Sequence, residues 1–228
     1  MTKDRPMGNM KFGIGIDGID KTLNTLDKVN KAFKQQESAM KANLSSFDKS
    51  SQSIEKYSQK ESDLAKLTEL QSKKVDILNK RRDEAIKTYG KESQQVANLT
   101  TEINKSTAKY NNYQRELDST RETLIKMGNG LTQLNGDIKK NAQEFNAQSN
   151  ALKKSGDEAG ALEVRQQGLR KQSELVNQAI KAQEQSIKEM GAQFGRSSTQ
   201  VQNAETELAE LKRQAQGTDT ELESVAKG

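Results

Sequence analysis

Apolar residues recur at alternating steps of three and four positions from Val96 to Leu152, in a single phase. An α-helix repeats every 3.6 residues, so a stripe that keeps a period of 3.5 over this length indicates a helix that supercoils with a partner helix. We therefore predict a long coiled-coil seam here. The seam residues singled out are Val96, Leu99, Ile103, Leu117, Leu124, Leu131, Leu134 and Ile138.

The composition agrees with narrow seams rather than a large core. The 228-residue chain is only 31% hydrophobic, and its one proline is Pro6, so no later position forbids a helix through proline. Such a composition suits either a disordered polar chain or long helices with narrow apolar stripes. The periodicity favours the helices. We predict an all-α fold of long amphipathic helices, forming coiled coils or antiparallel helical hairpins.

The N-terminal residues have a different pattern. Residues 1–10 are polar and charged, and we expect them to form a flexible arm. In residues 11–17, Phe12, Ile14 and Ile16 alternate with glycine or polar residues and would share one face of a short strand. No second strand is predicted to pair with it.

Two Gly–Ser stretches interrupt the helical pattern, near residues 89–93 and near residues 194–198. Gly90 and Gly195 can end a helix, and Ser93 and Ser198 can cap the next one. We predict an N-terminal helix over residues 18–58, a first coiled-coil unit over residues 59–154 and a second over residues 155–228, with one break in each unit.

The two breaks belong to an internal repeat with an offset of 105 residues. The segment Tyr89–Lys105 reads YGKESQQVANLTTEINK and the segment Phe194–Glu210 reads FGRSSTQVQNAETELAE, with seven of the seventeen positions identical. Each repeat is a helix, a break and a helix. At each break the chain either folds back as an antiparallel hairpin or runs on as a kinked rod that needs partner chains. We favour the hairpin for the isolated chain.

The residue types argue against catalysis. The chain has no Cys and no His, which excludes thiol chemistry, an imidazole base and the usual zinc sites. Gly13, Gly15 and Gly18 are not followed by the GK[ST] of a phosphate-binding loop. Carboxylates such as Asp83 and Glu84 fall on solvated helix faces. We predict no catalytic, cofactor-binding or metal-binding residue, no small-molecule substrate and no enzymatic activity.

The charge pattern limits the partners. There are 37 Lys+Arg and 32 Asp+Glu, interspersed along the chain, for a net charge of +5. Basic doublets such as Arg81-Arg82 are isolated and have no aromatic platform beside them, which argues against a nucleic-acid partner. No apolar run is long enough to span a membrane. The seams predict self-association through coiled coils.

Two stretches carry a resemblance to a known family. The opening Met10-Lys11-Phe12-Gly13-Ile14-Gly15-Ile16-Asp17, followed by a helix with a Leu/Phe seam, resembles the start of tail tape measure proteins of long-tailed phages and prophages of Gram-positive bacteria. The stretch from Tyr89 through Ser93, Val96 and Leu99 to Ile103 is similar to a "YGxxS…V..L..EI" unit repeated in their amino-terminal coils. The resemblance covers about residues 10–228.

The resemblance implies a structural role in the virion. Proteins of this family fill the tail lumen as helical bundles, and their length sets the tail length. They bind tail-assembly chaperones and then tail tube subunits, in the host cytoplasm during assembly and in the tail lumen afterwards. Family members are usually several times longer. Because 228 helical residues span at most about 340 Å, we expect this chain to be a fragment of such a ruler.

The residues alone are also compatible with a second interpretation, in which the protein is a cellular coiled-coil scaffold or adaptor with no phage role. A nucleotide-driven machine of the long-coil ATPase type is disfavoured, because no Walker motif flanks the coils.

Overall fold

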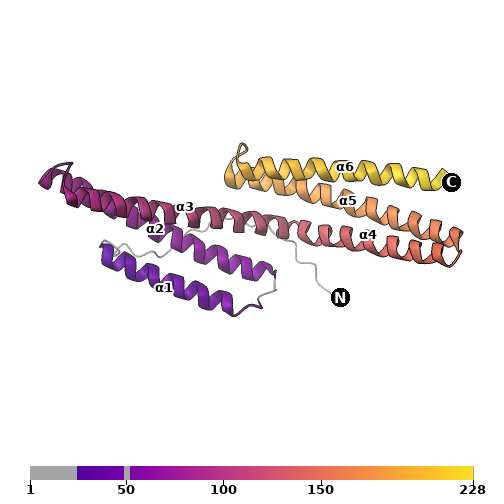
Figure 1. Cartoon of the computed structure of the whole chain (residues 1–228), viewed down its shortest axis with the longest axis horizontal. Coiled ribbons are helices and arrows are strands. Elements are labelled where there is room, and N and C mark those ends of the chain that lie inside the picture. Colours follow the sequence, from indigo (N-terminus) through magenta and orange to yellow (C-terminus); the bar gives the residue numbers. More distant parts are fainter. Residues whose placement is uncertain (1–24, 49–51, 228) are drawn as a thin grey trace. The chain divides into compact units, whose positions relative to one another are not determined.

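The computed structural model describes residues 25–48 and 52–227, which form α-helices joined by short turns (Figure 1). No strand occurs within these residues, so the all-α prediction is confirmed for this part of the chain. The arm expected over residues 1–10 and the strand expected over residues 11–17 lie outside the described residues. The helices are α1 (Leu26–Ser45), α2 (Ile54–Tyr89), α3 (Gln94–Gly128), α4 (Leu131–Lys154), α5 (Glu158–Phe194) and α6 (Thr199–Lys227).

The single helix expected over residues 18–58 differs from the structure, in which α1 ends at Ser45 and α2 begins at Ile54. Serine accounts for much of the difference, because its hydroxyl competes for backbone groups near helix ends. The Ser46 hydroxyl donates to the Asn43 carbonyl (2.6 Å), and the Ser53 hydroxyl accepts from the Lys56 amide (3.2 Å) as the N-cap of α2.

The chain divides into two compact units between Arg121 and Glu122, inside α3. The sequence-based division lay instead between residues 154 and 155. The structure places α4 with the later helices because its apolar face packs against α5. Within the first unit, α2 and the first part of α3 form an antiparallel hairpin.

Ion pairs show the direction of this hairpin. Lys74 Nζ lies 3.4 Å from Glu102 Oε1 near the turn, and Lys60 Nζ lies 2.9 Å from Glu116 Oε1 farther from it. Because the α2 numbers fall as the α3 numbers rise, the two helices run in opposite directions. Leu117 completes a cluster with Leu64 and Ala65 between the two helices.

Helix α1 packs along α2 in the same unit (Figure 1). Phe33 of α1 is buried against Leu67 and Leu70 of α2. Its ring also meets the Tyr113 ring of α3 edge to face, with centroids 5.8 Å apart. One aromatic side chain therefore joins all three helices of the unit, by a geometry that adds to simple burial.

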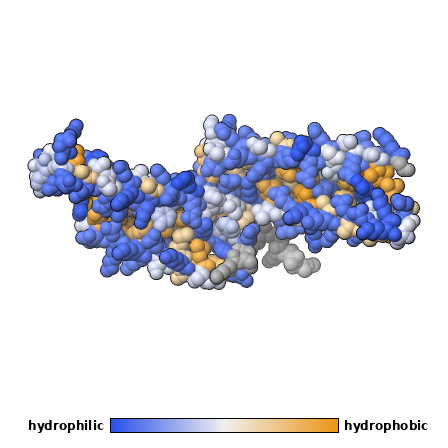
Figure 2. Space-filling model, in the orientation of Figure 1, coloured by the Kyte–Doolittle hydropathy of each residue, from blue (hydrophilic) through white to orange (hydrophobic). Residues whose placement is uncertain are grey.

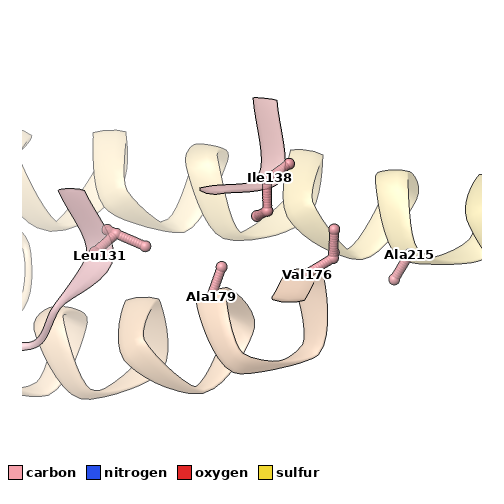
Figure 3. Close-up of a cluster of buried hydrophobic side chains, with 5 residues drawn as sticks. All are labelled: Leu131, Ile138, Val176, Ala179 and Ala215. Carbon is pink, nitrogen blue, oxygen red and sulfur yellow. The ribbon is translucent and has the colours of Figure 1, made fainter. Parts of the chain in front are cut away.

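The second unit has the same plan. Helix α5 lies between α4 and α6 in Figure 1 and packs against both. Figure 3 shows the apolar cluster that the three helices share. Its members are Leu131 and Ile138 of α4, Val176 and Ala179 of α5, and Ala215 of α6. The cluster is a narrow stripe, as the low apolar content requires.

The helices of the two units are related in order by the 105-residue offset. Helix α1 begins at Leu26 and α4 at Leu131, α2 ends at Tyr89 and α5 at Phe194, and α3 begins at Gln94 and α6 at Thr199. The repeat thus extends to α1 and α4, beyond the helix–break–helix unit found in the sequence. Each copy is a three-helix module, an arrangement in which every helix can bury one apolar stripe.

A matching ion pair supports the equivalence of the modules. Lys60 pairs with Glu116 in the first unit, and Arg165 pairs with Glu221 at the equivalent two positions of the second.

Polar and charged side chains cover most of the visible surface, with apolar groups in limited bands (Figure 2).

Candidate functional site: the helix breaks and the seams

The two predicted breaks have nearly the same backbone geometry. Gly90 follows the end of α2 with φ 81° and ψ 158°, and Gly195 follows the end of α5 with φ 91° and ψ 147°. This region of backbone space is essentially restricted to glycine. Each glycine amide donates to a helix carbonyl four residues earlier, that of Ile86 (3.0 Å) or Gly191 (3.1 Å). The chain then reverses at both positions.

The two serines lie just before α3 and α6. The amide of Ser93 donates to the Gly90 carbonyl (3.3 Å), and the amide of Ser198 donates to the Gly195 carbonyl (3.1 Å). Their hydroxyls behave differently. Ser198 Oγ accepts from the Val201 amide (3.3 Å), whereas Ser93 Oγ is buried with no hydrogen-bond partner among the described residues. Only the second turn therefore has a side-chain cap.

The seam residues are covered by helices of the same chain. Leu99 and Leu134 are half-buried. The other six are buried: Val96, Ile103, Leu117, Leu124, Leu131 and Ile138. The structure does not place the eight in one cluster, because the division between the units falls within the seam. Leu117 packs in the first unit, and Leu131 and Ile138 pack in the second.

Buried glutamines interrupt the hairpin interfaces, which the apolar pattern did not single out as sites. Gln71 of α2 donates its Nε2 to the Ser106 carbonyl of α3 (2.9 Å). Gln183 of α5 donates its Nε2 to the Ala204 carbonyl of α6 (2.7 Å) and to Glu207 Oε2 (3.1 Å). A buried polar group that finds its partner in only one register favours that register. The glutamines therefore help to fix how the hairpin arms align.

Asp63 is the centre of a polar cluster between α1 and α2, although only 1% of its surface is exposed. Gln36 Nε2 donates to Oδ1 at 2.9 Å, and Asn43 Nδ2 and Gln59 Nε2 donate to Oδ2 at 2.9 and 3.1 Å. Amide donors stabilise a buried carboxylate by replacing water. The sequence gives no local signal for this cluster, because two donors come from another helix.

Two titratable groups are perturbed by their partners. Burial, together with the hydrogen bond from its hydroxyl to Glu37 Oε1 (2.9 Å), raises the pKa of Tyr113 to about 12. Burial alone would lower the pKa of Lys126, but its hydrogen bonds to Glu207 and Glu122 reverse the direction and raise it. Each group bonds to a residue of another helix, Tyr113 to Glu37 and Lys126 to Glu207, so these interactions hold helices together.

The described residues hold no group of three or more Asp or Glu side chains placed to bind a metal ion. Within the same part of the chain, no helix is both long enough and apolar enough to cross a membrane. The features that the structure does build are hairpin turns, seams and interhelical polar contacts.

Comparisons of the chain with protein-family models, curated proteins and solved structures found no match.

Proposed function

We propose that the chain is a structural spacer of the tail tape measure type, which fills the lumen of a phage tail and contributes to setting its length. The observation that supports this most is the tandem repeat of a three-helix module along the chain. A repeated module makes the length of a protein proportional to the number of copies. The stretch that resembles the family, from Tyr89 to Ile103, forms the turn and the first part of α3 in this module.

The polar outer surface suits the proposed location. Charged and polar residues cover most of the visible face (Figure 2), which would keep the modules from adhering to the wall of a tube. We further propose tail tube subunits and tail-assembly chaperones as partners, in the host cytoplasm during assembly and in the tail lumen of the virion. These partners follow from the family resemblance.

Self-association is part of the same proposal, with a constraint from the fold. Most of the seam is buried within the chain, so copies cannot pair through residues such as Leu117 while the hairpins stay closed. Association would use half-buried seam positions such as Leu99 and Leu134, or hairpins that have opened.

An in-frame deletion tests the proposal in a phage that encodes this chain. Removing residues 26–130 deletes one repeat length and joins Thr25 directly to Leu131. We expect tails shorter by one uniform step, measured by electron microscopy. A step near 160 Å, which is 105 residues at about 1.5 Å each, would indicate an opened rod. A smaller uniform step would indicate closed hairpins.

The Gly136→Ala variant, which keeps the length of the chain, is the control and should leave the tails unchanged. Tails of normal length after the deletion would contradict the ruler role. A gene that is expressed outside any phage, with no product in virions, would support the alternative of a cellular scaffold or adaptor.

A further inference from the structure

The chain has two equivalent helices, α1 and α4, and each packs on one of two equivalent hairpins. Each helix must therefore pair with the correct hairpin. Helix α1 packs on α2, and α4 packs on α5, at positions related by 105 residues. Similar modules in one chain are prone to exchange elements within a molecule or between copies. The short connections from α1 to α2 and from α4 to α5 already disfavour this exchange, and a difference between the two interfaces would oppose it further.

The register of the two interfaces is the same. Gln36 of α1 donates its side-chain amide to Asp63 of α2. At the equivalent positions, Asn141 of α4 donates its side-chain amide to the Gly168 carbonyl of α5 (3.0 Å). Helix α4 would therefore reach position 63 if it lay on α2, and α1 would reach position 168 if it lay on α5.

The side chains at this point differ between the units. The second unit has a large ring, that of Phe145, against a glycine, Gly168. A Cβ atom built on Gly168 would lie well under 3.0 Å from Phe145 Cβ, so the two helix backbones can approach this closely only without a side chain at position 168. The first unit has a side chain at this position, because Asp63 is equivalent to Gly168.

The residue equivalent to Phe145 in the first unit is the flexible Met40. Met40 packs beside Leu64 and Ala65 and is only half-buried. An unbranched thioether adapts to an irregular space, whereas a phenyl ring does not. Asp63 also accepts amides from Asn43 and Gln59, which fix its place in the interface.

We propose that the pairs Met40 with Asp63 and Phe145 with Gly168 are specificity determinants that assign α1 to the α2/α3 hairpin and α4 to the α5/α6 hairpin. Phe145 on the first hairpin would meet the Asp63 side chain. Met40 on the second would leave space above Gly168. Each wrong pairing is penalised by overpacking or by a cavity. This assignment does not depend on the function proposed above.

Four chains of identical composition test the assignment. They are the natural chain, Met40→Phe/Phe145→Met, Asp63→Gly/Gly168→Asp, and the variant with all four changes. Urea unfolding, followed by circular dichroism, measures the stability of each chain. Because the four chains have the same composition, differences in stability reflect contacts in the folded state. We expect each two-residue exchange to raise the equilibrium constant for unfolding by roughly tenfold or more. The four-residue variant should lie closer to the natural chain than either exchange does.

Recovery in the four-residue variant is expected for a structural reason. An aspartate at position 168 would have Asn141 and Gln148 at the positions equivalent to Gln36 and Asn43. The matched control is Gln35→Lys/Lys140→Gln, an exchange between equivalent exposed positions. It removes only the exposed ion pair of Lys140 with Glu144, which contributes little, so unfolding should change little.

Two results would overturn the assignment: exchanges as stable as the natural chain, or a four-residue variant no more stable than the weaker exchange. If a two-residue exchange does not fold, the four-residue variant decides alone. A folded four-residue chain supports the assignment, and an unfolded one rejects it.

Discussion

Glycine has opposite roles at two interior helix positions of the second unit. Gly136 of α4 is exposed, and a Cβ atom built there has no neighbour within 4 Å. Gly168 of α5 lies against Phe145 with no room for a side chain. In a helix, glycine costs about 0.5–1 kcal/mol relative to alanine through its conformational entropy. Only the surroundings decide whether replacing it stabilises the fold.

The first prediction compares these two glycines by the same substitution. Gly136→Ala should raise the free energy of unfolding by about 0.5–1 kcal/mol, because it removes the entropic cost without a new contact. Gly168→Ala should lower it by about 1–3 kcal/mol, because α4 must move away. Urea unfolding measures both. Equal effects of the two substitutions would contradict the close approach at Gly168.

The second prediction concerns the tyrosines. Tyr113 should lose its proton near pH 12, later than an ordinary tyrosine, whose pKa is about 10. The unfolded chain deprotonates first, so the stability from the buried neutral hydroxyl is complete below pH 10 and is lost as the pH rises toward 12. With four tyrosines and no tryptophan, the absorbance of tyrosinate measures this cleanly.

Tyr113→Phe should remove the late phase of this titration, and Glu37→Gln should shift it to lower pH because a neutral amide replaces the charged carboxylate. Four tyrosines that titrate together near pH 10 would show that Tyr113 is not buried against Glu37.

At the scale of elements, the long helices, the breaks at Gly90 and Gly195 and the hairpins there could be predicted from sequence. The break between α1 and α2, and the packing of α1 and α4 on the hairpins, could not. The three-four spacing is a local property, and so is a glycine followed by a capping serine, as at Gly90 and Ser93. Whether α4 packs with α3 or with α5 depends on contacts between residues far apart, such as Asn141 with Gly168. The Asp63 cluster was missed for the same reason, because Gln36 and Asn43 reach it from another helix.

The third prediction tests the hairpin turn as an element. Gly195→Ala places a side chain in backbone geometry that is essentially open only to glycine, so it should destabilise the second unit by about 1–3 kcal/mol. The control is Gly217→Ala in α6, where an added Cβ atom has no neighbour within 4 Å and should stabilise the helix slightly. Thermal unfolding followed by circular dichroism measures both. A Gly195→Ala chain as stable as the Gly217→Ala chain would contradict the turn geometry.

At the scale of the whole molecule, the chain holds two three-helix modules whose hairpins are closed within one chain. The corresponding pairs Lys60–Glu116 and Arg165–Glu221 each join helices across a hairpin and each span 56 residues of sequence. A continuous helix would separate the members of each pair by about 84 Å. The closed hairpin brings them into contact, so the two arrangements differ by a distance that is easy to measure.

The most direct measurement is therefore the distance between two spin labels. In one chain, cysteines that replace Lys60 and Glu116 carry the labels. In a matched second chain, cysteines that replace Arg165 and Glu221 carry them. The natural chain has no cysteine, so only the chosen sites are labelled. We predict short distances for both pairs, at the lower end of the range that pulsed electron paramagnetic resonance resolves. Distances near 80 Å in either chain would show that the module runs on as a rod and would contradict the closed hairpin.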